Sequence, residues 1–273
     1  MDRNLRGIAS LRRASLKSGR ASRKLVSFVT QRASIFSRRS ILAAAAGLPL
    51  AATGEQALQR LKIVVTGGHP GDPECGCAGT IARYSDLGHE VVLLYMNRGE
   101  GYCNGADASQ CGVIRTEEAH KACEILKARA AFVGQIDGQS VVDNAHYEGF
   151  RQLLDSEKPD AVFAQWPIDE HPDHRALSVL VLNAWMKGGK KFALYYYEVA
   201  DDTMMFSPTE YVDISAPNVE ARRHAACYAH ASQQPEKWYP HQTELTRFRG
   251  IESGHSQAEG FVRHWQSKSI LLP

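Results

Sequence analysis

The stretch that decides the fold is 61-LKIVVTGGHPGDPE-74. Its first half, LKIVVTGG (61–68), is a continuous apolar run rich in β-branched residues, which is typical of a parallel strand buried on both faces. Its second half, HPGDPE (69–74), places His69 and Asp72 three residues apart directly after that strand. Ligands of open α/β sheets bind at the carboxyl ends of strands. The stretch therefore predicts a functional site at the end of the first strand.

Strand-like and helix-like segments alternate from residue 61 onward. Further strands are predicted at 90–97, 131–133, 160–164 and 192–199, and helices at 78–87, 115–128, 146–157, 177–186 and 218–232. This alternation predicts an α/β fold, a Rossmann-like and mostly parallel sheet with helices on both faces. The segment 233–273 is mixed and aromatic and carries no clear element. No GxGxxG follows the first strand, so a dinucleotide site is unsupported.

Charge divides the chain near residue 53. Residues 1–53 hold eleven of the 32 Lys and Arg and one of the 30 Asp and Glu, so residues 54–273 carry a net charge of −8. The sequence therefore predicts a basic leader over 1–53 and one α/β domain over 54–273. An acidic domain disfavours nucleic acid as a partner.

The leader resembles a twin-arginine export signal. SRRSIL (37–42) precedes an apolar stretch that is too short and too interrupted to serve as a stable membrane anchor. We therefore expect export to the periplasm or the outside of the cell, and a basic tail on a cytoplasmic protein is the alternative. In an exported protein Cys103 and Cys111 can pair across a loop, which their spacing permits but does not require.

A second predicted strand ends in the same kind of residues. WPIDEHPDH (166–174) follows the strand at 160–164, at the same edge of the sheet as the first motif. We therefore expect His69, Asp72, His171 and His174 to converge. Two imidazole nitrogens and one carboxylate oxygen, with an open fourth position, form a catalytic zinc site. Zinc is thus the expected cofactor, although such ligands also accept iron or cobalt.

The first motif also has a purely structural interpretation. Asp72 as N-cap, Pro73 at the first helical position and Glu74 in the first turn together favour the start of a helix. The presence of two histidine-containing motifs at two strand ends favours metal binding over a cap alone. Glu74 is expected to be structural.

The two motifs resemble the signatures of the PIG-L/LmbE-like zinc N-deacetylases. HPGDPECGCAGTIARY (69–84) is similar to the first signature, commonly His-Pro-Asp-Asp followed by Glu or Pro-Glu, and HPDH (171–174) to the second. With weaker matches, the resemblance covers roughly residues 61–265. It implies a Rossmann-like domain that hydrolyses an N-acyl group, typically an acetyl group on an amino sugar.

The resemblance also assigns roles to the four converging residues. It implies that His69, Asp72 and His174 ligate zinc. It implies that His171 assists the tetrahedral intermediate or the leaving amine.

The sequence departs from the family pattern at Gly71, where the family has an aspartate that acts as general base. Three explanations stay open. Another carboxylate takes over, with Asp169, Glu170 and Asp173 beside the second motif and Glu100 on a strand-end loop as candidates. Alternatively, hydrolysis proceeds slowly without a dedicated base, since such assistance is worth about 10²–10⁴-fold. In the third explanation the protein binds an acylated ligand without turnover.

Polar side chains near the predicted strand ends are candidates for substrate binding. Arg98, Glu100 and Arg115 can hydrogen-bond a sugar, and pairing of Arg115 with a neighbouring glutamate is the structural alternative. Trp166 and Trp238 can stack on a sugar, with burial in the core as the alternative. The expected partner is a small N-acylated sugar or conjugate. The expected function is N-deacetylation, and the alternative is a non-catalytic, zinc-containing protein that binds a sugar or another metabolite.

Overall fold

The computed structural model describes residues 59–103 and 105–273. The leader predicted over 1–53, with its twin-arginine motif, lies outside these residues. Among the described helices, none combines the length and the hydropathy needed to cross a membrane. The elements follow one another in this order: β1 (Lys62–Gly67), α1 (Asp72–Asp86), β2 (Glu90–Tyr95), α2 (Ala108–Leu126), β3 (Arg129–Phe132), α3 (Asn144–Glu157), β4 (Ala161–Gln165), α4 (Pro172–Lys187), β5 (Ala193–Tyr197), β6 (Glu210–Asp213), α5 (Pro217–Tyr228), the 3₁₀ turn η1 (Ala231–Gln233), α6 (Pro235–Ser253) and β7 (Ala258–Arg263).

One seven-stranded sheet organises the domain, in the order β3-β2-β1-β4-β5-β7-β6. The pairs among β1 to β5 are parallel, and β7 inserts antiparallel between β5 and β6. The predicted α/β fold with a mostly parallel sheet is therefore confirmed. The chain winds from β1 toward β3 and then crosses to β4 on the other side of β1. The loops after β1 and β4 thus meet at the switch point where such sheets bind ligands.

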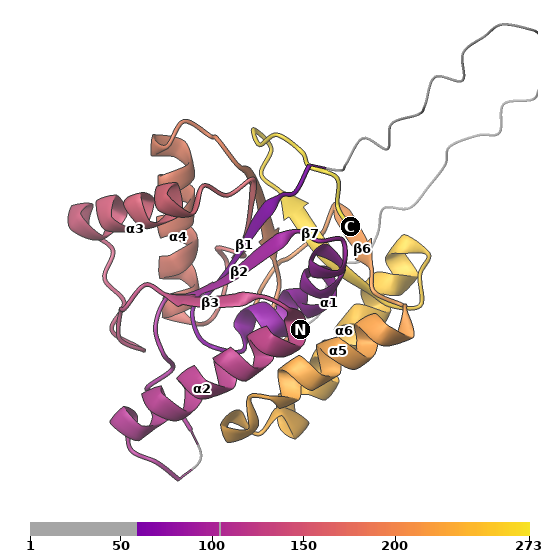
Figure 1. Ribbon diagram of the computed structural model, residues 1–273, viewed down its shortest axis with the longest axis horizontal. Coiled ribbons are helices and arrows are strands. Elements are labelled where there is room, and N and C mark those ends of the chain that lie inside the picture. Colours follow the sequence, from indigo (N-terminus) through magenta and orange to yellow (C-terminus); the bar gives the residue numbers. More distant parts are fainter. Residues whose placement is uncertain (1–58, 104) are drawn as a thin grey trace, which may run out of the picture. The chain divides into compact units, whose positions relative to one another are not determined.

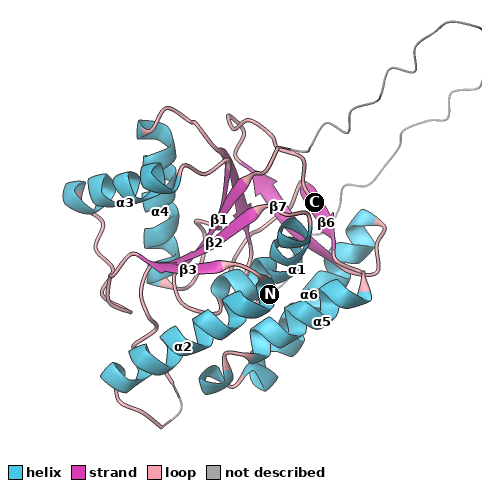
Figure 2. Cartoon of the chain, viewed as in Figure 1, coloured by secondary structure: helices cyan, strands magenta, loops and turns pink. Residues whose placement is uncertain are grey.

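Helices cover both faces of the sheet (Figures 1 and 2). Ile63 and Val65 of β1 pack in a cluster with apolar residues of α1, α2 and α5, whereas Val64 packs in a second cluster with α3 and α4. Successive side chains of a strand point to opposite faces, so β1 is buried on both. This explains why its sequence is apolar throughout rather than alternating.

Three helices begin at least five residues earlier than their apolar pattern indicates. α1 begins at Asp72 instead of residue 78, α2 at Ala108 instead of residue 115, and α4 at Pro172 instead of residue 177. Apolar periodicity does not mark these first turns because polar residues, proline or glycine interrupt it there. The sequence analysis also missed three C-terminal elements. α6 contains Pro240, which is normally a helix breaker, β6 has only four residues, and β7 lies in the segment without a prediction.

Two helical glycines are expected to respond in opposite directions to replacement by alanine. A Cβ at Gly76 in α1 would lie 2.8 Å from the Glu198 carbonyl oxygen and against the Tyr197 ring. Gly76→Ala is therefore expected to cost about 1–3 kcal/mol of unfolding free energy through overpacking. A Cβ at Gly149 in α3 meets nothing within 4 Å, so Gly149→Ala is expected to stabilise by about 0.5–1 kcal/mol. Urea denaturation measures both, and stabilisation by Gly76→Ala would contradict the close approach of α1 to β5.

Candidate metal centre

Three side chains from the two motifs meet beyond the ends of β1 and β4. Asp72 Oδ2 lies 3.3 Å from His69 Nδ1 and 3.2 Å from His174 Nε2. The two ring nitrogens are 3.2 Å apart. Around a tetrahedral zinc ion, with bonds of about 2.0–2.1 Å to nitrogen and oxygen, ligand atoms lie about 3.3–3.4 Å from one another. The triangle of donor atoms therefore fits one face of a zinc coordination shell.

Buried carboxylates hold each histidine on its other nitrogen. His174 Nδ1 lies 3.0 Å from Asp169 Oδ1. His69 Nε2 lies 3.2 Å from Asp173 Oδ2 and 3.2 Å from Asp137 Oδ1. Such contacts fix the orientation of metal-binding imidazoles and the nitrogen that carries the proton. They leave His174 Nε2 and His69 Nδ1 directed at the same point.

This placement argues against a base role for two of the carboxylates that the sequence analysis proposed. Asp169 and Asp173 are each only 1% exposed. Asp169 accepts a hydrogen bond from the Thr203 hydroxyl, and Asp173 accepts one from the Asn97 side chain. Both carboxylates therefore lie behind the histidines rather than in front of them. Glu170 is exposed and does not border the cavity that lies over the triangle.

Asp72 is not the N-cap of α1, as the structural interpretation of its motif predicted. The cap position is Gly71, and Asp72 is the first residue of the helix. Its Oδ2 accepts a hydrogen bond from the His69 backbone N–H at 2.8 Å. Burial alone would raise the pKa of Asp72, but His174 and His69 hold it well below its usual range. Asp72 is thus fixed as a carboxylate beside both rings.

Gly68, the residue directly after β1, makes room for these rings. A Cβ at this position would lie 2.7 Å from His174 Cδ2 and 3.3 Å from Asp72 Oδ2. The backbone therefore passes directly beside the ligand atoms, and a side chain here would displace them.

Gly71 adopts a backbone conformation that other residues avoid. Its φ is 110°, and a Cβ there would lie 3.4 Å from the Gln233 side-chain amide. Gln233 Nε2 donates to the Pro70 carbonyl at 2.9 Å, and the Gly71 N–H donates to Glu74 Oε2 at 3.1 Å. Because L side chains rarely adopt this φ, an aspartate at this position needs a different turn. Glu74 is fully buried and structural, as predicted.

His171 caps α4 and faces the cavity. Its Nδ1 accepts a hydrogen bond from the Asp173 backbone N–H at 3.2 Å, so a neutral ring carries its proton on Nε2. Burial and the neighbouring His69 and His174 lower the pKa of His171, which favours the neutral form at pH 7. A fixed N–H donor of this kind can stabilise developing negative charge on a substrate oxygen.

Negative charge surrounds the two histidines of the triangle. Burial alone would lower the pKa of both rings. Asp72 and Asp169 instead raise the pKa of His174 to about 9, and three carboxylates raise that of His69 well above its usual value. The same carboxylates favour a dication, which must displace these protons when it binds.

A cavity of about 330 Å³ lies over the triangle. Arg115 borders it, as the sequence analysis expected of a substrate-binding residue. Arg98 is exposed and pairs with Glu100, with Nε and Oε1 2.9 Å apart, and neither residue borders the cavity. Of the three predicted substrate-binding residues, Arg115 alone therefore borders this cavity.

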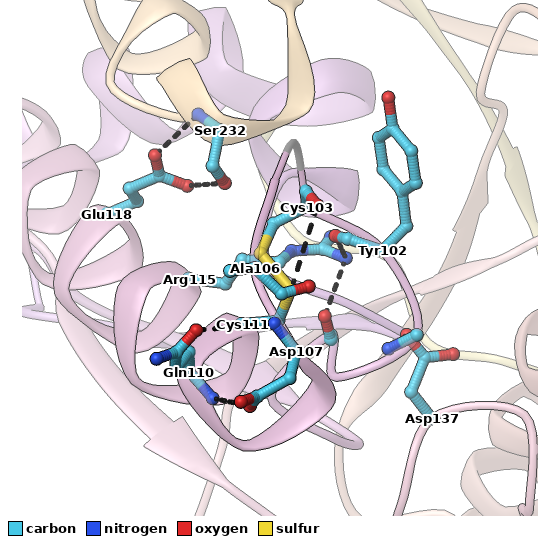
Figure 3. The surroundings of a disulfide bond; sticks show 12 residues. Tyr102, Cys103, Ala106, Asp107, Gln110, Cys111, Arg115, Glu118, Asp137 and Ser232 are labelled. Atoms are coloured by element: carbon cyan, nitrogen blue, oxygen red, sulfur yellow. Dashed lines mark hydrogen bonds between the residues drawn. A yellow bond between two sulfur atoms is a disulfide. The ribbon is translucent and has the colours of Figure 1, made fainter.

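Arg115 shapes the loop between β2 and α2 (Figure 3). Its Nη1 donates to the carbonyls of Gly99 at 3.0 Å and Tyr102 at 3.2 Å. Its Nη2 donates to the Pro70 carbonyl at 2.9 Å. The guanidinium thus joins the loop after β2 to the turn after β1, and both line the cavity.

A disulfide between Cys103 and Cys111 closes the same loop (Figure 3). The pairing that the sequence permits is therefore formed. Glu118 is a glutamate close enough in sequence to pair with Arg115. It instead accepts hydrogen bonds from Ser232 N and Oγ, each at 2.7 Å. This contact joins α2 to the η1 turn that precedes α6.

Two carboxylates in the cavity wall were missed. Asp137 lies in the loop after β3, and no motif marks it. Asp202 follows β5, and its position after a predicted strand is the sequence feature that could have marked it as a site residue. Asp202 Oδ2 is 3.9 Å from His174 Nδ1, and its carboxylate makes no hydrogen bond within residues 59–103 and 105–273. Burial raises the pKa of Asp202 to about 6.

The two tryptophans with open roles differ in their surroundings. Trp166 packs edge-on against Tyr196 and Phe206, with ring centroids 5.7 and 5.4 Å away. Trp238 is half-buried and borders a second cavity beside Asp72.

Comparisons with known proteins agree with this geometry. Residues 64–185, which contain both motifs, match the family model described as PIG-L: GlcNAc-PI de-N-acetylase. Diacetylchitobiose deacetylase of Thermococcus kodakarensis is 27% identical over 229 residues, 73% of this chain and 81% of that protein. The conserved protein TT1542 of Thermus thermophilus has a TM-score of 0.68 at 28% identity, covering 77% of this chain and 97% of its own. GalB of Pseudomonas putida KT2440, a 4-carboxy-2-hydroxymuconate hydratase, shares the fold, with a TM-score of 0.67 at 20% identity over 78% of this chain and 100% of its own.

Asp169→Asn is expected to weaken zinc binding about 10–100-fold, because the carboxylate that orients His174 is lost. Glu170→Gln makes the same chemical change on the adjacent, exposed side chain and is expected to keep the wild-type Kd. Competition with a chromophoric chelator measures both constants. A wild-type Kd for Asp169→Asn would contradict the positioning role.

The metal-free protein is expected to lose stability as the pH rises from 6.5 toward 9. The folded state holds a proton on His174 with a pKa raised from 6.5 to about 9, so this contribution is complete below pH 6.5 and is lost through about pH 9. A dication bound at His174 would take the place of the proton, so the protein loaded with zinc is expected to show little slope in this window. Urea unfolding with and without chelator measures the difference, and His174→Gln should reduce the slope. A metal-free protein with constant stability would contradict the ion-pair assignment.

Proposed function

We propose that this chain is a zinc-dependent hydrolase that releases acetate from an N-acetylated amino sugar or a related small molecule, a proposal that the match of residues 64–185 to the PIG-L family model supports. The observation that carries the proposal is the triangle of His69 Nδ1, Asp72 Oδ2 and His174 Nε2, with sides of 3.2–3.3 Å. The cavity above the triangle provides room for the reacting amide.

In such a site, the chemistry that zinc supplies is polarisation of the carbonyl and acidification of a water. The residues of the chain do the rest. His171 donates its Nε2–H to the carbonyl oxygen as negative charge develops there. Loss of one such donor typically costs about 10²–10³-fold in kcat. The neutral ring keeps this proton, so the departing amine takes the proton that a carboxylate of the cavity wall accepts from the attacking water.

We assign proton acceptance from the attacking water to Asp202, in place of the aspartate missing at Gly71. Of the two carboxylates that sequence reasoning missed, Asp137 is engaged by the Gly101 N–H at 2.9 Å and by His69. The Asp202 side chain is 38% exposed and borders the cavity. Its pKa of about 6 leaves it ionised at neutral pH and close to the value that suits a general base. This supports the explanation in which another carboxylate takes over.

Acetate release from N-acetylated sugars by the zinc-loaded protein tests the proposal. Asp72→Ala is expected to lose zinc and activity together. Asp202→Asn is expected to retain zinc and to lower kcat about 10²–10⁴-fold. Glu170→Gln, a matched change on an exposed side chain, should retain both.

Two results would contradict these assignments in different ways. A zinc-loaded wild type that binds N-acetylated sugars without releasing acetate would favour the non-catalytic alternative. If the wild type is active and Asp202→Asn keeps full activity, Asp202 is not the general base and another group accepts the proton.

We also propose that the protein is exported. The SRRSIL motif at 37–42 and the Cys103–Cys111 disulfide support this, since disulfides persist mainly in oxidising compartments. Recovery of the native protein only from the cytoplasmic fraction would favour the alternative.

A further inference from the structure

Thr203 lies where the loop after β5 meets the loop after β4. Asp169 and Thr203 form an isolated antiparallel bridge between these two loops. Beside the bridge, the Glu170 N–H donates to the Asp202 carbonyl at 2.9 Å. The segment that carries Asp202 is therefore fastened to the segment that leads into α4.

The hydroxyl of Thr203 makes one hydrogen bond in each direction. It accepts a hydrogen bond from the Val199 backbone N–H at 2.9 Å and donates to Asp169 Oδ2 at 3.0 Å. A hydroxyl has a single proton, and an N–H or a carboxylate leaves no choice about where that proton points. Among the described residues, Thr203 supplies the one hydrogen bond to Asp169 Oδ2. The hydroxyl therefore fixes this oxygen.

The other oxygen of Asp169 holds two groups of the site. Asp169 Oδ1 accepts a hydrogen bond from the His171 backbone N–H at 2.9 Å and lies 3.0 Å from His174 Nδ1. A carboxylate that is held at both oxygens cannot rotate about its Cβ–Cγ bond. Thr203 thus fixes the plane of the carboxylate that directs His174 toward Asp72, as the outer partners of metal-binding histidines do.

The same hydroxyl closes the turn that carries Asp202. Val199 and Thr203 are joined twice, because the Thr203 N–H also donates to the Val199 carbonyl at 3.0 Å. Asp202 lies inside this turn, and no hydrogen bond to another described residue holds its carboxylate. The position of the carboxylate at the cavity therefore depends on the backbone of the turn.

We propose that Thr203 is a positioning residue that couples the two halves of the site through one hydroxyl. Through Asp169 it orients His174 for the metal, and through the turn at 199–203 it places Asp202 for the attacking water. Thr203 itself borders neither of the two cavities beside the triangle, so its effect passes through these partners. This inference rests on the proposed function.

Zinc binding tests the link through Asp169. Thr203→Val keeps the branched shape of the side chain and removes the hydroxyl. It is expected to raise the Kd for zinc about threefold to tenfold, less than the 10–100-fold of Asp169→Asn, because it acts one contact further from the metal. Thr203→Ser restores the hydroxyl and is expected to return the Kd to within about twofold of the wild-type value. Competition with a chromophoric chelator measures all three constants.

Turnover at saturating zinc tests the link through Asp202, with acetate release from N-acetylglucosamine and N,N′-diacetylchitobiose as the assay. Thr203→Val is expected to lower kcat about tenfold, less than loss of the base itself, and to change KM less than about twofold. In the Asp202→Asn background, the same substitution should lower kcat less than about twofold, because two residues that act as one unit are not additive. Thr203→Ser should restore kcat.

Thr243→Val is the matched control. Thr243 is half-buried like Thr203, and its hydroxyl donates to the Tyr239 carbonyl at 3.1 Å within α6. It borders neither cavity, so the variant is expected to keep the wild-type Kd and kcat. Should Thr203→Val not fold, Thr203→Ala is read in the same way, because its smaller side chain lets water reach the Val199 N–H.

Failure of the proposed function and failure of this inference give different results. If the zinc-loaded wild type releases no acetate, the proposed function fails. The zinc constants of Thr203→Val and Thr203→Ser still test the link through Asp169 in that case, because they require no turnover.

Three results would overturn the inference. One is a Thr203→Val variant that binds zinc and releases acetate as the wild type does. Another is a Thr203→Ser variant as impaired as Thr203→Val, which would assign the effect to the methyl group. The third is an equal fall in kcat in the wild-type and Asp202→Asn backgrounds, which would show that the hydroxyl does not act through Asp202.

Discussion

The carboxylate of Asp72 lies between the rings of His69 and His174, and the rest of the site depends on this contact. Parallel pairing of β1 with β4 brings together two motifs about 100 residues apart in the chain. Gly68 lets the backbone pass beside the ligand atoms. The His69 N–H fixes Asp72 Oδ2 at 2.8 Å. Any change that moves the start of α1 relative to the start of α4 therefore separates the three donor atoms of the triangle.

The surrounding carboxylates differ in role because of helix geometry. Asp173 and His174 are adjacent in α4, and successive side chains point about 100° apart around a helix. His174 therefore faces Asp72, while Asp173 turns toward Asn97 and His69. Adjacency in sequence made Asp173 a candidate base, but its direction makes it a support for a ligand. Asp202, more than 25 residues further along the chain, reaches the cavity instead.

Much of the fold and the convergence of His69, Asp72 and His174 could be predicted because each depends on a local pattern. β1 is a continuous apolar run, and each motif directly follows a strand. The other parts of the site come from loops with no such pattern. Asp137, Asp202 and Gln233 reach it through tertiary packing of β3, β5 and the η1 turn, and Pro240 concealed α6. The positive φ of Gly71 likewise shows only in the folded chain. It means that an aspartate at this position would need a different turn.

The most direct test of the metal centre is a crystal structure of the zinc-loaded protein with anomalous data collected on both sides of the zinc edge. One zinc peak per chain is expected, about 2.0–2.1 Å from His69 Nδ1, Asp72 Oδ2 and His174 Nε2. A peak between His69 Nε2, Asp137 and Asp173, or no stoichiometric zinc at either place, would contradict it.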